Sequence, residues 1–180
     1  MDFVEIVLIG VGLSMDAAAV SAISGMSIRG LRVREAVSIA LAFGLFQGLM
    51  PLIGYFAGSA FAQLMASFAP WVALVVLCAV GAKMLWEAFH GDGDEGMNRF
   101  SYRLLLAQAV ATSLDALAVG VSFAAVQVDI LWAGGIIACC TFLISLVSVY
   151  IGRVFGAALA DKAQILGGVI LILIGIRMVL

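Results

Sequence analysis

Two aspartates lie in closely similar surroundings in the two halves of this sequence. Asp16 lies in the string SMDAAAV and Asp115 in the string SLDALAV, each near the middle of a long apolar run. A carboxylate at the centre of a bilayer costs roughly 2.5–3.5 kcal/mol on insertion scales, so its presence there points to a function. Two adjacent carboxylates cannot neutralise each other, and they call for a shared cation or for protons. We therefore interpret Asp16 and Asp115 as candidate cation ligands.

A structural role for the two aspartates is the alternative. Each could cap a broken helix or pair with a buried base. Lys83 is the one base deep in an apolar segment, and Glu87, one helical turn further on, is its better partner. The pairing alternative is therefore the weaker one.

The remaining polar side chains of the apolar segments carry oxygen atoms that could complete a cation site. They are Ser14, Ser113, Gln47, Ser21, Ser122, Thr141 and Ser145. Serine and threonine also serve close helix packing in membranes, and that interpretation stays open for each of them. Carboxylate, hydroxyl and amide oxygens suit Mg²⁺, Ca²⁺ or Mn²⁺ better than Cu²⁺ or Zn²⁺. No cofactor is expected, because Cys78, Cys139 and Cys140 form no CxxC motif and His90 is the only histidine.

The composition shows what kind of protein holds these residues. Of the 180 residues, 65% are hydrophobic and 11% are charged. Soluble domains have about 45–50% apolar and about 25% charged residues, and disordered chains are more polar still. The formal net charge of -2 gives no sign of nucleic-acid binding. We predict an all-α, polytopic membrane protein that contacts the lipid bilayer and needs no obligate protein partner.

Six apolar segments are long enough to cross a bilayer as helices, which takes roughly 20 residues each. Their expected bounds are 3–26, 35–60, 70–89, 104–126, 131–151 and 164–180. Lipid admits only helices or closed barrels, and continuous apolar runs without strict alternation argue against a barrel. A small-residue turn is expected at 61–69, and the hydrophilic stretch 90–103 is expected to be a loop.

The distribution of lysine and arginine predicts the orientation, because these residues favour cytoplasmic connections. Seven of them lie in the first, third and fifth connections: Arg29, Arg32, Arg34, Arg99, Arg103, Arg153 and Lys162. The second and fourth connections have none, and Arg177 near the end of the last segment is the exception. Both termini are therefore predicted to lie outside, with the 90–103 loop in the cytoplasm.

The sequence also repeats itself. Besides the two aspartate strings, Gly54 and Gly58 match Gly152 and Gly156, and the string GAKM at 81–84 matches GIRM at 175–178. A repeat unit with three crossings must enter the membrane from the opposite face in its second copy. We predict one transmembrane domain over 1–180, built as inverted repeats of about 1–89 and 104–180, an architecture of many secondary transporters.

These strings, together with MPLIGYFAG, GAKMLWEAF and DKAQILGGVILILIG, resemble the MntP-type manganese efflux pump family over essentially the whole chain. The resemblance implies a multi-pass protein of the bacterial inner membrane that exports manganese, with Asp16 and Asp115 at the matching motif positions. Mn²⁺ would then be a transported substrate rather than a cofactor, and the protein would not be an enzyme.

The leading hypothesis is export of Mn²⁺ by alternating access, in exchange for protons that neutralise the empty aspartate pair. Export of another cation or of an amino acid by the same architecture is the first alternative. An intramembrane aspartyl protease, which also uses two aspartates, is a distant one, because the sequence around Asp16 and Asp115 lacks a Gly-x-Gly-Asp motif.

Overall fold

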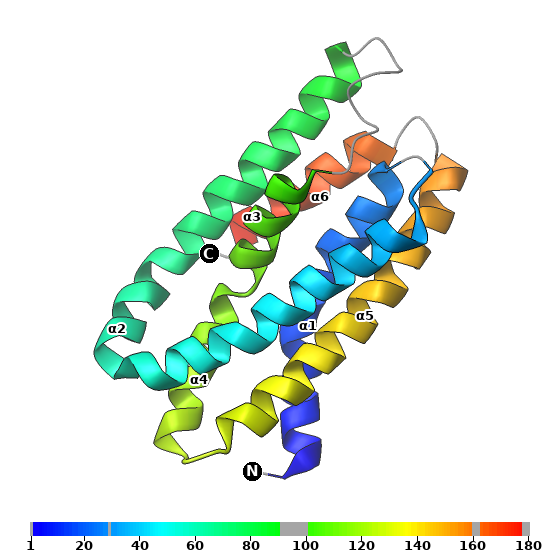
Figure 1. Cartoon of the computed structure of the whole chain (residues 1–180). Helices are drawn as coiled ribbons and strands as arrows, with labels where there is room; N and C mark the ends of the chain where they lie inside the picture. The colour runs from blue at the N-terminus through cyan, green and yellow to red at the C-terminus, as the bar shows by residue number, and fades with distance from the viewer. Residues whose placement is uncertain (1, 29, 91–100, 160–162, 178–180) are drawn as a thin grey trace.

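The computed structural model describes residues 2–28, 30–90, 101–159 and 163–177, and every regular element among them is a helix. The helices are α1 (Phe3–Ser27), α2 (Val33–His90), α3 (Tyr102–Thr112), α4 (Leu114–Ala125), α5 (Ile130–Leu159) and α6 (Ala163–Arg177). In Figure 1 the end of α1, the start of α2, the start of α3 and the end of α5 lie at one end of the bundle. The N-terminus, the bend of α2 and the α4–α5 turn lie at the other end. The all-α prediction is confirmed for the described residues.

Acidic side chains cap the beginnings of three helices. The backbone N–H of Asp2 donates to Glu5 Oε2 over 2.9 Å at the start of α1, and that of Arg32 donates to Glu35 Oε2 over 2.9 Å before α2. Asp129 Oδ1 accepts from the N–H of Leu131 at 3.1 Å and also from that of Trp132. These contacts satisfy N–H groups that have no partner within their own helix.

The chain reverses within α2 earlier than the sequence indicated. Gly58 has φ of 76° and ψ of 172°, and helical conformation resumes directly after it and continues to His90. The turn predicted at 61–69 is therefore wrong by a few residues. The physical reason is that glycine has no Cβ and can adopt a positive φ that other residues rarely reach.

The segment predicted as one helix at 104–126 is divided into α3 and α4 at Ser113, which has φ of -106° and ψ of 2°. The two helices are bent by 40° relative to each other. The corresponding part of α1 is continuous through Asp16. The two halves of the chain thus differ in the backbone next to their aspartates.

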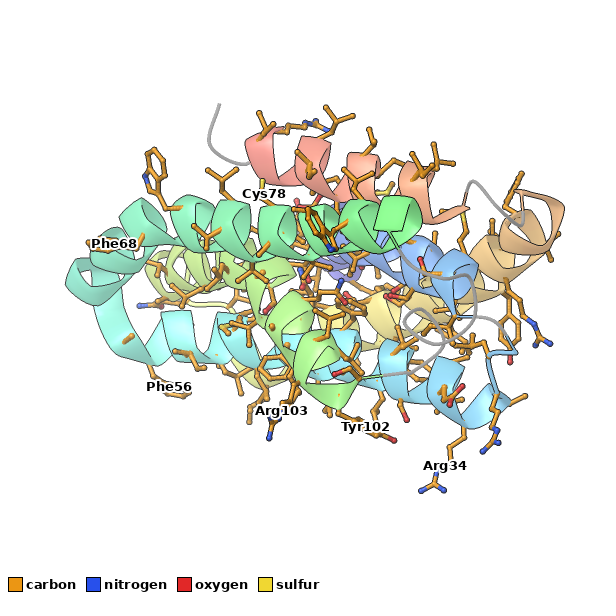
Figure 2. All side chains as sticks on the ribbon, turned by 90° about the horizontal axis from the view of Figure 1, so that it is seen from above. Arg34, Phe56, Phe68, Cys78, Tyr102 and Arg103 are labelled. Carbon is orange, nitrogen blue, oxygen red and sulfur yellow. The ribbon has the colours of Figure 1, made fainter. Side chains whose placement is uncertain are left out.

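Three helical stretches are long and apolar enough to span a bilayer: Phe3–Ser27, Val33–Gly58 and Ile130–Phe155. The bent pair α3–α4 raises this number to four if it crosses as one span, and Ile165–Ile174 is a shorter apolar helix. Large apolar side chains are exposed on the outside, as for Leu45 at 52% and Phe56 at 75%. Figure 2 shows Phe56 pointing away from the bundle, as a lipid-facing side chain would. These features indicate a multi-pass membrane protein.

Close helix crossings hold the bundle together, and two of them join α1 with α5 and α2 with α4. Gly25 of α1 lies against the carbonyl of Val149 in α5, and Gly152 of α5 lies against that of Ala22. In the same manner Gly54 of α2 lies against Leu117 O in α4, and Gly120 of α4 lies against Pro51 O. Backbones this close leave no room for a Cβ atom, as is usual where small residues mediate helix packing in membranes.

Candidate functional site

The two aspartates come together in the interior of the bundle. Asp16 lies in the middle of α1 and Asp115 in the first turn of α4, and both side chains are half-buried. Their carboxylates are close enough for their charges to interact. Asp115 Oδ1 also accepts a hydrogen bond of 2.8 Å from the N–H of Ala116. The break at Ser113 therefore places Asp115 at a helix N-terminus, where free N–H groups and the helix dipole favour a negative charge.

Gln47 connects the three helices around the aspartates. This residue of α2 is fully buried, and its Nε2 donates to Leu13 O of α1 over 3.0 Å. Its side chain also interacts with the carboxylate of Asp115 in α4. The amide oxygen Oε1, however, is buried without a hydrogen-bond partner. Such an atom costs roughly 1–3 kcal/mol, so it is the kind of oxygen that a cation or a water molecule would bind.

A line of hydroxyl groups follows the contact between α1 and α5. Ser14 donates to Gly10 O, and its Oγ lies 2.8 Å from Thr141 Oγ1. One turn further along α5, Ser145 is buried and its Oγ has no partner. Ser21 on α1 is also buried without a partner for its Oγ. The structure thus places four of the predicted polar residues along the interface of α1 and α5.

The other two predicted serines are occupied by their own helices. Ser113 is buried at the break and donates to Val110 O over 3.1 Å. Ser122 is exposed, and its hydroxyl lies 3.3 Å from Ala118 O. The structure does not bring Ser122 to the aspartates.

Three further polar residues of the described region were not predicted as site residues. Gln108 is 5% exposed, and its backbone carbonyl accepts from the hydroxyl of the buried Thr112 over 3.0 Å. Gln108 precedes Asp115 by seven residues, so its helical periodicity could have indicated a shared face. Arg177 of α6 lies close enough to Asp16 for their charges to attract. Sequence spacing does not predict this last contact, because it depends on how α6 packs against α1.

Some predicted features lie outside the described part of the chain. The side chains of Lys83 and Glu87, and residues 91–100 with Arg99, are not described. Among the residues that are, no three histidine, cysteine, aspartate or glutamate side chains form a group suited to a metal ion.

Residues 30–179 match the protein family described as "Putative manganese efflux pump". The chain belongs to this family. A "Putative manganese efflux pump MntP" of Ruminiclostridium cellulolyticum is 41% identical over 179 residues, covering 98% of this chain and 95% of the relative. Proteins of the same name from Methanosarcina mazei and Methanosarcina acetivorans are each 44% identical and cover 98% and 97% of this chain. No solved structure matches the chain.

Membership in the manganese efflux pump family confirms the resemblance read from the sequence strings. The match is nearly full-length in both directions, with 94% or more of the three named relatives aligned. Those relatives are named as pumps rather than as enzymes. With its apolar helices, the chain is therefore a multi-pass membrane protein of an efflux family.

The hydrogen bond between Ser14 and Thr141 gives a prediction about stability. Replacing Ser14 by alanine or Thr141 by valine should each lower the melting temperature of the purified protein in detergent slightly. The loss in free energy of unfolding in the double variant should be smaller than the sum of the two single losses. The expected difference is about 0.6 kcal/mol, the average coupling for such bonds in a membrane protein. Thermal unfolding of the four proteins measures this, with the exposed Ser122→Ala as a control expected to be neutral. Additive effects would show that the two hydroxyls do not interact.

Proposed function

We propose that this protein exports Mn²⁺ across the bacterial inner membrane, with Asp16 and Asp115 as the two charged ligands of the transported ion. The observation that carries the proposal is the meeting of two carboxylates inside an apolar bundle, next to the unpartnered amide oxygen of Gln47. A divalent cation would neutralise both carboxylates and satisfy that oxygen. The name of the related proteins supports manganese as the ion.

The neutral ligands we propose also follow the repeat. Gln47 and Ser145 are 98 residues apart, the same separation as Gly54 and Gly152. Both are fully buried, and each has a side-chain oxygen without a partner. A site with two carboxylates and two neutral oxygens is composed of the hard ligands that Mn²⁺ accepts. Ser14, Ser113, Ser21 and Thr141 would assist by holding the backbone or by lining the path, whereas Ser122 is too exposed for either role.

We propose that the chain crosses the membrane six times, as two inverted three-helix repeats with both termini outside. The crossing of α1 with α5 and that of α2 with α4 support this arrangement, because equivalent helices meet through glycines in both. Arg34 at the start of α2, Arg103 at the start of α3 and Arg153 in α5 lie towards one end of the bundle. Figure 2 shows Arg34 and Arg103 at its periphery. Such a grouping of arginines is typical of the cytoplasmic side.

Export of a divalent cation requires an energy source. An inside-negative potential of 100 mV opposes it by about 4.6 kcal/mol, twice the value for one charge. After release of the metal, the two carboxylates would face each other in a low-dielectric interior, where protons can replace the lost charge. We therefore propose exchange of Mn²⁺ for protons.

Everted membrane vesicles test the exporter and its coupling together. Mn²⁺ should accumulate in vesicles that contain the protein when their interior is acid, and each exchanged proton should support about tenfold accumulation per pH unit. A protonophore should abolish the accumulation, and vesicles without the protein are the control. Mn²⁺ accumulation that does not depend on the pH gradient would contradict proton exchange. Accumulation of radiolabelled amino acids in place of Mn²⁺ would contradict the exporter proposed here.

A further inference from the structure

Buried polar side chains are confined to one half of the bundle. Among the described residues they are Ser14, Ser21, Gln47, Gln108, Thr112, Ser113, Thr141 and Ser145. All lie at the level of the aspartates or on the side where α1 ends and α2 begins. Ser21, for example, lies five residues beyond Asp16, which is about 7.5 Å along a helix. This half also contains a larger apolar cluster with Val20, Ile23, Ile39 and Phe43, but among the described residues it is the half in which buried polar side chains continue beyond the aspartates.

Two of these residues are distinguished by having no hydrogen bond. A serine inside a helix commonly donates to the carbonyl four residues earlier. Ser24 and Ser27, on the same helix as Ser21, do so over 2.9 and 2.8 Å. Ser21 and Ser145 are each 0% exposed, yet neither hydroxyl oxygen has a partner. Their hydroxyls are therefore free to bind water or the water shell of an ion.

In the opposite half, the fully buried side chains of the described residues are apolar. Ile6, Phe123, Val128, Ile130, Ala133 and Ile137 form a buried cluster, which we call the apolar plug. It joins α1, α4 and α5 towards the end where α1 begins, and Leu13, Leu52 and Tyr55 pack around it. Apart from the half-buried Tyr55, an ion or its hydration water finds no hydrogen-bonding side chain among the described residues of the plug, so passage through the plug in this form is very costly.

We infer that Ser21 lines the access path by which a hydrated divalent cation reaches Asp16 and Asp115, that the proposed ligand Ser145 lies at the inner end of this path, and that the apolar plug is the gate for release of the ion. The inference rests on the proposed export function and assigns a loading side and a release side to it. In the proposed orientation the access path opens to the cytoplasm.

The backbone agrees with this asymmetry. The α3–α4 pair is bent by 40° just before Asp115, whereas α1 continues without a break through Asp16. In transporters built from inverted repeats, rocking of one repeat against the other opens the site to alternate sides. Unequal conformations of two equivalent helices are therefore expected in a form that is open to one side.

Cysteine labelling tests the two sides directly. Ser21→Cys and Ser145→Cys are introduced separately into the full chain, and Ala133→Cys in the plug is a size-matched control. A charged, water-soluble thiol reagent is applied to everted vesicles, with the parent protein giving the background from its own cysteines. Both path variants should react about tenfold or more faster than Ala133→Cys, because reaction requires an accessible thiolate. Added Mn²⁺ should slow their reaction.

The outcomes separate this inference from the proposed function. Equal rates at all three positions, or faster reaction at Ala133→Cys, would overturn the access path whatever the protein transports. Fast reaction at Ser21→Cys and Ser145→Cys without protection by Mn²⁺ would support the path and contradict the manganese site. If a cysteine variant does not fold, the flux of Ser21→Ala decides, since Ser145 is also a proposed metal ligand: slower Mn²⁺ accumulation at low metal concentration supports the path, and unchanged accumulation overturns it.

Discussion

Replacing Asp115 by asparagine should abolish manganese export. The variant keeps the size of the side chain and an oxygen that can accept the hydrogen bond from the N–H of Ala116. It removes one of the two charges that balance the ion. The loaded site would then carry a net positive charge through the membrane interior, which costs roughly 2.5–3.5 kcal/mol on insertion scales. Since 1.4 kcal/mol corresponds to a factor of ten, the expected loss of transport is about a hundredfold.

The measurement is the manganese content of cells grown in excess manganese, determined by elemental analysis. Cells with Asp115→Asn should accumulate as much manganese as cells without the protein. Asp129→Asn is a matched control, since Asp129 is an exposed aspartate that caps α5 and asparagine caps helices equally well. Export by Asp115→Asn at the parent level would contradict the two-aspartate site.

Asp16→Asn should lose manganese export to the same extent as Asp115→Asn if the two aspartates act as one unit. The double variant should then be no worse than either single variant, because residues that act together are not additive. Arg177 offers a contrast, because its charge is near Asp16 rather than Asp115. A milder loss in Asp16→Asn would indicate that Arg177 changes the charge balance on that side of the site.

The sequence predicted those features that depend on local chemistry. Asp16 and Asp115 stand out because a charge in an apolar run is costly wherever the run folds. Their approach to each other depends on how α1 and α4 each pack against the neighbouring helices, chiefly α5 and α2, and the repeat predicted that the two aspartates would meet. The free oxygen of Gln47 is different. This oxygen is left without a partner because Gln47 uses its amide group to contact Leu13 O and the carboxylate of Asp115. Sequence spacing alone does not predict these contacts.

The backbone breaks could not be located from the sequence in the same way. Gly58 carries the reversal of α2 and Ser113 the break before α4, but the sequence has 20 glycines and many serines. Which of them leaves the helical conformation depends on neighbouring helices. In α1, the matching Ser14 stays helical and bonds Thr141 of α5 instead. Equivalent residues thus adopt different conformations because their surroundings differ.

Replacing Gly25 by alanine should destabilise the protein, although the same change at Gly12 should not. Both glycines lie in α1, and alanine is the better helix former by about 1 kcal/mol in an exposed position. A Cβ at Gly12 meets nothing within 4 Å. At Gly25 it would collide with the carbonyl of Val149 and lie 3.1 Å from the N of Arg153, both of them backbone atoms of α5. Side chains could rotate away from a new methyl group, but a helix backbone can only move as a whole.

We expect Gly25→Ala to lose about 1–3 kcal/mol, the usual cost of overpacking, and Gly12→Ala to be neutral or slightly more stable. Thermal unfolding in detergent compares the two variants with the parent. Gly120→Ala, at the crossing of α4 with α2, should behave like Gly25→Ala, since its Cβ would meet the backbone of Pro51. Equal stability of Gly12→Ala and Gly25→Ala would contradict the close crossing of α1 and α5. Agreement between Gly25→Ala and Gly120→Ala would instead support two crossings of the same kind, as inverted repeats require.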